Sequence, residues 1–482
     1  LQWNLVLIPP ITGIIGYVTN WVGIRLLFHP LEFRGFKMPG LKQLAPMLPR
    51  KIQQIPGVME GKVGWQGIIP SRSAKMGRVA YDASIAKLAS QQEFYERLDP
   101  DRIAQHMVAQ SRDNFHAYVD DLLGREQPVV WNSVPDGARQ FVHARIEQQL
   151  PEVADRIMQS TAENIDEVLS LKLMVIDYLD NHPELLNRMF LEVGDEELTF
   201  LVNSGFYFGT LLGVFSIPLF LFFNRAWWVL PVSGVLVGYF TNYIAIKAIF
   251  NPQEPVEIGP FTLQGLFIQR QEEVAERYGE IVAEEIITVE NVAQNLLYGK
   301  RSDRTRRMIE EAIRPSLDEA LGMAAPVIRV ATGDRRYEEI RDALATEGVE
   351  YALEPLQDTD FNRERSIPVK ELIASRMQEL PPQDFTMTLR SAFKEDEWLL
   401  IAIGAALVAR LARGVVPLER DQRDPRRVAP VRGGIVEANA AGVLSGVAER
   451  VLIFGRANGA HVGSADTVRQ EPPAEHVDYL RS

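Results

Sequence analysis

Three long runs without a charged side chain constrain the fold of this chain more than any other feature. They cover residues 1–24, 198–224 and 226–246, and only Arg225 separates the last two. A helix needs about 20 mainly apolar residues to cross the hydrocarbon core of a bilayer, so each run is long enough. A buried helix of a soluble protein is the alternative for each run, but three such runs are hard to accommodate in a soluble fold. We therefore expect an integral membrane protein.

The average composition hides this segregation, because 46% hydrophobic and 24% charged residues are an ordinary globular balance. The first run has no basic region before it and no small-residue cleavage site, which disfavours a removable signal peptide. The net charge of −13 disfavours non-specific binding to nucleic acid, which requires a basic surface. The sequence contains no cysteine, which excludes disulfides, thiolate metal sites and cysteine nucleophiles.

A motif in the first apolar run recurs in the third. Residues 16–32 read GYVTNWVGIRLLFHPLE, and residues 238–254 read GYFTNYIAIKAIFNPQE. Two further blocks repeat in the same order: QGIIPSR (66–72) with QGLFIQR (264–270), and GDEELTFLVNSG (194–205) with KEDEWLLIAIGA (394–405). Three blocks in one order make chance similarity improbable, so the sequence predicts an internal duplication.

The predicted fold class is all-α, an internally duplicated integral membrane protein with three to four transmembrane helices and two long helical cytoplasmic segments. The predicted parts are a first transmembrane helix with the GYxTN motif (1–32), a helical segment (33–195), transmembrane helices 2 (198–224) and 3 (226–252, with the second GYxTN motif), a second helical segment (253–395), a terminal apolar helix (398–413) and a disordered tail (414–482). The terminal helix has twelve apolar residues before Arg410 and Arg413, so whether it spans is left open.

Apolar residues at helical spacing, for example Val142, Ile146 and Leu150, predict that the polar segments are helical. Asp99 followed by Pro100 predicts a helix start, because aspartate caps free amides and proline suits the first turn. Pro151 either kinks one helix or starts another.

Basic residues predict the orientation in the membrane. Residues 25–51 hold six cations and one acid, and basic flanks tend to stay in the cytoplasm. Both helical segments are then cytoplasmic, and both motif helices cross in the same direction, as in a parallel repeat. The predicted location is the cell inner (plasma) membrane, crossed several times.

The polar residues of the repeated motif are candidate site residues, namely Tyr17, Thr19, Asn20, Tyr239, Thr241 and Asn242. Asparagine and threonine inside a span are costly unless they bond to a neighbouring helix. One interpretation packs the two motif helices together, with Asn20 and Asn242 bonding across the interface. The other interpretation has the motif line a polar path or bind a lipid headgroup. In the second span, Gly205, Gly209 and Gly213 favour close helix packing.

Four cations are candidate headgroup contacts: Arg25, Lys247, Arg72 and Arg270. The first two lie near the predicted cytoplasmic ends of spans, where long cationic side chains reach the lipid phosphates. For Arg72 and Arg270, a salt bridge with a neighbouring glutamate is the alternative. The cation-rich stretch 33–65 either lies on anionic headgroups or is a long connection.

No catalytic motif accompanies these features. The seven histidines form no metal-ligand spacing, and the phosphate-binding, dinucleotide and nucleophile-elbow motifs are absent from the sequence. We therefore expect that the protein is not an enzyme and that it has no catalytic residue, cofactor or metal site.

The doubled motif, the QGxxxxR block and EDEWLLIAIGA together resemble the YheB/YjiN-like family of bacterial membrane proteins, domain of unknown function 445, over residues 8–409. The positions carried over are Gly16, Tyr17, Thr19, Asn20, Pro30, Glu32, Gly238, Tyr239, Thr241, Asn242, Pro252, Glu254, Arg72 and Arg270. The resemblance implies an integral membrane protein of the bacterial envelope with large helical extramembrane parts. The sequence departs from the family where Arg410 and Arg413 replace an expected glycine-rich helix.

Two functional hypotheses follow. The first is a non-enzymatic envelope anchor or scaffold, or a lipid-handling protein, whose helical segments form two cytoplasmic arms. The alternative is a transporter or channel with a polar path between the two Thr-Asn motifs. The expected partners are membrane lipids. A second copy of the chain or a protein on the cytoplasmic side are further candidate partners, and nucleic acid is not expected to bind.

Overall fold

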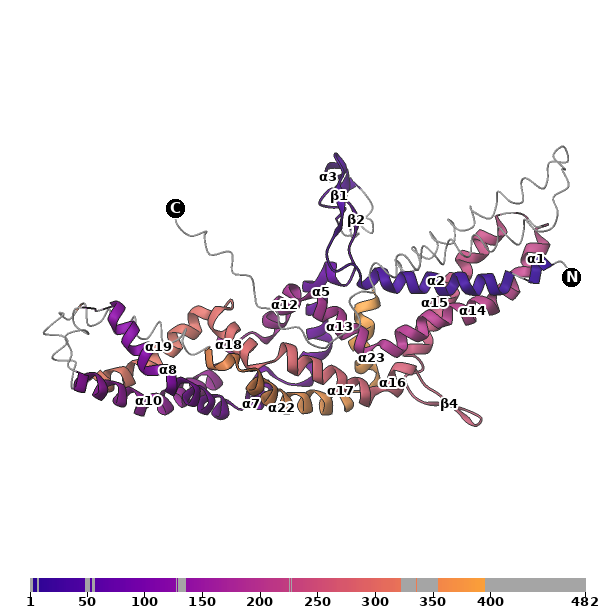
Figure 1. Cartoon of the computed structure of the whole chain (residues 1–482). Coiled ribbons are helices and arrows are strands. Elements are labelled where there is room, and N and C mark those ends of the chain that lie inside the picture. The colour runs from indigo at the N-terminus through magenta and orange to yellow at the C-terminus, as the bar shows by residue number, and fades with distance from the viewer. Residues whose placement is uncertain are drawn as a thin grey trace. The chain divides into compact units, whose positions relative to one another are not determined.

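The structure, a computed structural model, describes residues 3–6, 8–47, 53, 57–126, 128, 136–224, 226, 228–321, 335 and 354–394 (Figure 1). These residues are mainly helical, and three of their helices are long and apolar enough to cross a membrane. They are α2 (Ile8–Phe28), α14 (Asp195–Phe222) and α15 (Val229–Phe250), at the places of the three predicted spans. The predicted terminal helix (398–413) and tail (414–482) lie outside the described residues.

The remaining helices lie in the two polar segments, apart from α1 (Trp3–Val6). The first segment contains α3 (Leu41–Leu44), η1 (Ala45–Met47), η2 (Pro70–Arg72), α5 (Ser73–Ala80), η3 (Tyr81–Ile85), α6 (Ala86–Leu88), α7 (Gln91–Arg97), α8 (Pro100–Glu126), α10 (Asp136–Glu163), α11 (Ile165–Val168), α12 (Leu171–Asn181) and α13 (Pro183–Val193). The second contains α16 (Leu266–Gln269), α17 (Gln271–Ile281), η4 (Val282–Ile286), α18 (Val289–Tyr298), α19 (Ser302–Leu321), η5 (Glu354–Gln357), α22 (Thr359–Gln378) and α23 (Pro382–Lys394).

Local sequence explains where several of these helices begin. The predicted start at Asp99 is confirmed, because α8 begins at Pro100 and the Asp99 carboxylate accepts a hydrogen bond from the amide of Arg102 (3.3 Å). Ser90 and Glu93 form a reciprocal capping box at the start of α7. Pro151 lies inside α10, so the alternative that it starts a new helix is wrong.

Two short antiparallel hairpins depart from the predicted all-α fold. Strand β1 (Arg34–Lys37) pairs with β2 (Lys62–Trp65), and β3 (Val256–Ile258) pairs with β4 (Phe261–Leu263). Each hairpin follows a membrane-spanning helix. Strands of three or four residues are too short to show the alternation of apolar and polar residues by which strands are recognised.

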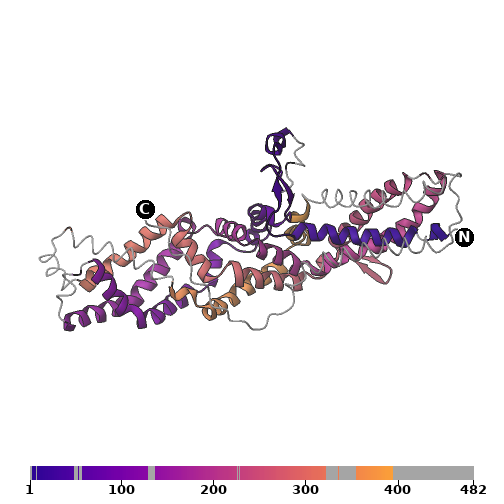
Figure 2. The ribbon, with the colours of Figure 1, turned by 45° about the horizontal axis from the view of Figure 1, so that its top comes forward.

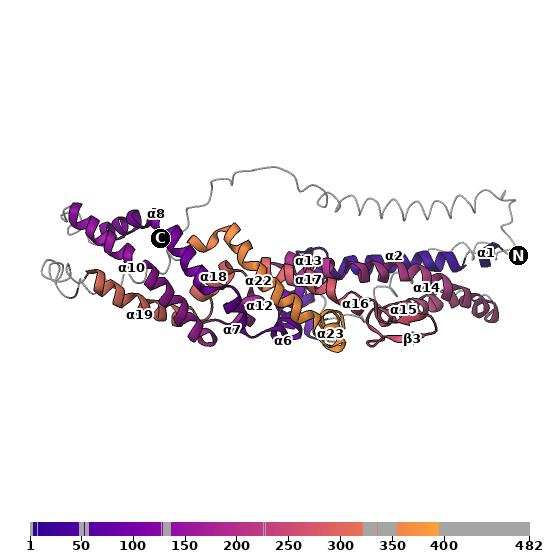
Figure 3. The same ribbon diagram turned by 90° about the horizontal axis from the view of Figure 1, so that it is seen from below.

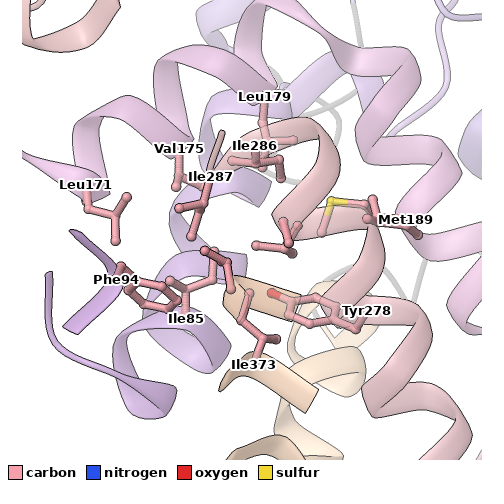
Figure 4. Close-up of a cluster of buried hydrophobic side chains, with 14 of the residues drawn as sticks. Ile85, Phe94, Leu171, Val175, Leu179, Met189, Tyr278, Ile286, Ile287 and Ile373 are labelled. Carbon is pink, nitrogen blue, oxygen red and sulfur yellow. The ribbon is translucent and has the colours of Figure 1, made fainter. Parts of the chain in front are cut away.

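The two polar segments share one hydrophobic core rather than forming two separate arms. The core cluster contains Ile85, Phe94 and Leu171 from the first segment together with Ile286 and Ile373 from the second (Figure 4). Helix α22 of the second segment packs against α7 of the first as well as against α17. Figures 2 and 3 show that helices of the first polar segment lie among helices of the second. The expectation of two arms is therefore wrong, because burying these side chains requires both segments.

Candidate functional site

The first two spans touch through their backbones. A β-carbon on Gly16 of α2 would overlap the carbonyl oxygen of Gly205 in α14, and one on Gly205 would lie 2.5 Å from the carbonyl oxygen of Gly16. Gly209 and Gly213 face α2 in the same way, against Gly13 and Pro9. The glycine repeat of the second span is thus a helix-packing surface, as the sequence predicts.

Asn20 bonds across this interface to the second span. Its side-chain Nδ2 donates a 2.8 Å hydrogen bond to the backbone carbonyl oxygen of Leu201, and the residue is only 7% exposed. Close backbone approach at Gly16, one turn earlier on α2, brings the amide within reach of that carbonyl. The interpretation that pairs Asn20 with Asn242 differs from the structure, because the Asn20 donor is directed at α14.

The second copy of the motif is used differently. Thr241 is buried, and its Oγ1 donates to the carbonyl oxygen of Gly238 in the same helix (3.0 Å). Apart from its chain neighbours and the backbone of its own helix, no described atom lies within 4 Å of a β-carbon placed on Gly238. Asn242 is half-buried, while Tyr239, like Tyr17 in the first copy, is exposed. Thr19 is buried beside Asn20.

The two motif cations lie on aromatic rings at corresponding ends of their helices. The guanidinium of Arg25 is 5.5 Å from the centre of the Trp21 ring, and Nζ of Lys247 is 6.0 Å from the centre of the Tyr243 ring. Such contacts stabilise a cation and leave donors for other groups. Contact of Arg25 and Lys247 with lipid headgroups stays a prediction.

The two polar segments with their shared core are called the helical domain below. Arg270 binds three carboxylates where α14 meets this domain. Its distances are 3.0 Å to Glu197, 3.3 Å to Glu196 and 2.7 Å to Glu273. Glu197 is only 3% exposed, so the guanidinium supplies the counter-charge that a buried carboxylate requires. A hydrogen bond from Arg270 lowers the pKa of Glu273. Arg72, at the end of η2, also has an interaction partner, and lipid contact of either arginine stays a prediction.

The repeated Gln-Gly pair fastens the chain after each hairpin to the end of the preceding span. The amide of Gly67 donates to Pro30 and that of Gly265 to Pro252, both at 2.9 Å. Gln66 Nε2 donates to the carbonyl of Leu31 (2.7 Å), and Gln264 donates to Gln253 in the same way. Sequence reasoning recognised this block as a repeat but gave it no structural role.

Two positions that sequence reasoning did not select also join the spans to the domain. Asn187 Nδ2 donates to the carbonyl oxygen of Phe28, the last residue of α2, at 2.6 Å. Glu197 holds Arg270, and its only sequence signal is the repeated acidic block that precedes the second span. The spans are therefore bonded to the helical domain at α2 and at α14.

A small cavity lies in the core close to these contacts. It has a volume of about 30 Å³, and its lining includes the buried hydroxyls of Ser84 and Tyr278. Burial raises the pKa of Tyr278 to about 12. One water needs about 10–15 Å³ of such space, so the cavity has room for water and not for a larger molecule. No three His, Cys, Asp or Glu side chains gather as a metal site within the described ranges.

Comparison with known proteins agrees with the resemblance seen in the sequence. Residues 232–413 match a family described as "Protein of unknown function (DUF445)". Similar curated proteins are named UPF0754 membrane protein, and they include those of Cyanothece sp. (31% identical over 92 residues, 18% of this chain and 23% of the relative), Bacillus cereus strain AH187 (38% over 66 residues, 13% and 18%) and Staphylococcus epidermidis (34% over 89 residues, 18% and 23%).

The chain thus covers less than a quarter of the length of each of these relatives. No solved structure matches it. The family match and the names of the relatives confirm the predicted resemblance to a DUF445 bacterial membrane family, and the three apolar helices agree with it.

The two glycines of the motif provide a matched test of the span interface. Gly16→Ala should lower the free energy of unfolding by about 1–3 kcal/mol, because its methyl group has no room against Gly205. Gly238→Ala should change the free energy of unfolding little, because no described atom of another helix lies within 4 Å of the added methyl group. Thermal unfolding of the two detergent-purified variants, followed by circular dichroism, measures the difference. Equal midpoints would contradict the backbone contact.

The Arg270 cluster gives a second prediction. Arg270→Leu should destabilise the chain by about 3–5 kcal/mol, since it leaves the Glu197 carboxylate buried without a counter-charge. The double variant Arg270→Leu/Glu197→Leu should recover much of this loss. Glu273→Gln removes an exposed partner and should have little effect. Urea unfolding in detergent checks the cycle, and a double variant no better than Arg270→Leu alone would disprove the coupling.

Proposed function

We propose that this relative of the DUF445 bacterial membrane proteins is a non-enzymatic, multi-pass anchor of the cell inner (plasma) membrane. It holds a helical domain at the cytoplasmic surface, where the domain scaffolds protein partners or handles lipids. The observation that carries the proposal is the bond from Asn20 to the Leu201 carbonyl beside the Gly16–Gly205 contact. The polar group of the first motif is thereby used to hold two spans together.

The shared core supports placing both polar segments on one side of the membrane. Side chains such as Leu171 and Ile373 belong to one hydrophobic cluster, and a core of this kind cannot form across a bilayer. Helices α2 and α15 then run toward the domain, and α14 runs away from it. This direction agrees with the parallel repeat expected from the sequence.

The distribution of basic residues supports a cytoplasmic side. The end of α2 next to the domain carries Arg25, and the stretch that follows it, 33–65, contains six cations and one acid. Lys247 lies at the corresponding end of α15. Excess Lys and Arg near short connections to spans favours retention in the cytoplasm.

Repeated local structure supports an internal duplication. A short hairpin follows each motif helix, and a Gln-Gly pair ties each hairpin back to the helix end. A five-residue π-helical turn then occurs in each half, at η3 and η4. Further along each half a side-chain oxygen caps a helix, Ser90 at α7 (after the three-residue α6) and Thr288 at α18. Four matching features in one order support the duplication that the sequence repeat predicts.

Firm attachment between spans and domain supports an anchor. Asn187 binds the last carbonyl of α2, and Arg270 binds Glu197 in the first turn of α14. The rings of Phe250 and Phe267 meet at 5.9 Å where α15 joins the domain. Each span thus has its own contact with the domain, so a force or displacement on the domain reaches the membrane part directly.

A transporter or channel is the second candidate. The hydroxyls of Thr210 in α14 and Ser233 in α15 are buried without a hydrogen-bond partner among the described residues, and Asn242 is only half-buried. Unpaired polar groups inside a span are characteristic of substrate and ion pathways as well as of helix contacts. Thr210 faces Gly13 of α2, in the same helix interface as the Asn20 bond, whereas Ser233 and Asn242 lie on the third span.

Single Asn-to-Leu variants separate the two candidates. An anchor requires that Asn20→Leu lower the thermal midpoint of the full chain in detergent, because it removes the bond to Leu201, while Asn242→Leu keeps the midpoint. Wild-type protein in planar bilayers bathed in KCl should show no conductance above that of empty bilayers. A wild-type conductance that Asn242→Leu abolishes without changing the midpoint would contradict the anchor and support the channel.

A further inference from the structure

The first hairpin and the two short helices that follow β1 carry a cluster of exposed apolar side chains. We call this cluster the hairpin surface, and its residues are Phe36 (68% exposed), Met38 (51%), Leu44 (58%), Met47 (83%), Met59 (46%) and Val63 (40%). Six large apolar side chains within thirty residues exceed the scattered exposure that is normal for a water-facing surface. The hairpin is labelled β1, β2 and α3 in Figure 1.

Cations alternate in the sequence with these apolar residues. Lys37 and Lys42 are exposed, and Lys42 lies between Met38 and Leu44 in the sequence. The single acid of the stretch, Glu60, forms an ion pair with Lys62. Residues 33–65 are thus positively charged although the whole chain has a net charge of −13. Such a local positive charge attracts an anionic surface.

The base of the hairpin is held at the end of the first span. Trp65 Nε1 donates to the carbonyl of Leu26 (3.0 Å), and Gln66 donates to Leu31 (2.7 Å). Leu26 belongs to the last turn of α2, where a spanning helix reaches the lipid headgroups. Strands of four residues extend about 13 Å, so the hairpin surface remains within reach of that boundary.

From these observations we infer that the hairpin surface binds anionic phospholipid. Its apolar side chains enter the boundary between headgroups and acyl chains, and Lys37 and Lys42 contact the lipid phosphates. Apolar residues combined with cations beside a span are the chemistry of an interfacial membrane anchor. A lipid surface is favoured over a protein partner because the tether at Leu26 keeps the hairpin at the membrane whatever the rest of the domain binds.

The second hairpin provides a natural contrast. Residues 251–265 contain two acids, Glu254 and Glu257, and no cation. Its exposed apolar residues, Val256 and Leu263, therefore lack the positive charge that attracts anionic lipid. The preference for anionic lipid is assigned to the first hairpin alone, although both follow a motif helix.

This inference rests on the proposed membrane anchor, and the experiment keeps the two claims separate. The sequence has no cysteine, so single cysteines can be placed and labelled with an environment-sensitive fluorophore. The full chain is reconstituted in nanodiscs of phosphatidylcholine, with or without an equal amount of phosphatidylglycerol, containing spin-labelled lipid as quencher. Met47→Cys reports the hairpin surface, Phe215→Cys on α14 reports a span, and Ile367→Cys on α22 reports an exposed apolar position of the domain.

The label at position 47 should shift to the blue and be quenched by lipid spin-labelled near the headgroup, most strongly with phosphatidylglycerol. Adding Lys37→Glu and Lys42→Glu should remove most of that phosphatidylglycerol-dependent quenching. The label at 215 should be quenched by lipid spin-labelled deep in the acyl chain. The label at 367 should remain accessible to iodide and be insensitive to either quenching lipid.

Other outcomes reject one claim or both. Quenching at 215 but not at 47 would overturn the hairpin assignment and leave the anchor intact. No quenching at either position would reject the membrane anchor itself. A blue-shifted label at 47 that spin-labelled lipid does not quench would place protein on the hairpin surface, and so would overturn lipid binding there. Quenching at 47 that is the same in both disc compositions would overturn the role of the lysines.

Discussion

One hydrophobic core built from two distant parts of the chain is the constraint on which the rest of the structure depends. Ile85 and Phe94 of the first polar segment pack in the same cluster as Ile286 and Ile373 of the second. Burying such side chains contributes about 1.5–3 kcal/mol each, and neither segment contains all the partners. An apolar helix precedes each segment and α14 follows the first, so in the proposed membrane anchor the shared core requires the domain-facing ends of all three helices to lie on one side.

Contacts at the ends of the spans transmit that constraint to the membrane part. Asn187 binds the end of α2, and the buried Glu197 at the start of α14 is neutralised by Arg270 from the second segment. The ion pair therefore joins a span of the first half to the domain residues of the second. Between the first two apolar helices, glycines allow α2 and α14 to approach closely, and Asn20 adds a hydrogen bond to the backbone of α14.

The sequence predicts those features that depend on neighbouring residues. The absence of charge predicts the three apolar helices, the spacing of Gly205, Gly209 and Gly213 predicts a packing face, and Asp99 with Pro100 predicts a helix start. Features that depend on distant partners are not predicted. Asn20 and Asn242 have similar local sequences, yet among the described residues the side chain of Asn20 bonds to a backbone carbonyl of another helix and that of Asn242 does not. The difference arises because α14 approaches α2 closely at Gly205. The hairpins are too short for a periodic signal, and nothing in one polar segment indicates that the other completes its core.

The most direct test of a shared core is the side of the membrane on which each polar segment lies. Gln92→Cys in α7 and Tyr298→Cys in α18 place one exposed thiol in each segment of a chain without cysteine. A maleimide that cannot cross membranes is applied to intact spheroplasts and to inverted vesicles containing either variant. Our account predicts that both thiols are protected in spheroplasts and that both react in inverted vesicles. Reaction of one thiol in spheroplasts and of the other only in inverted vesicles would contradict it.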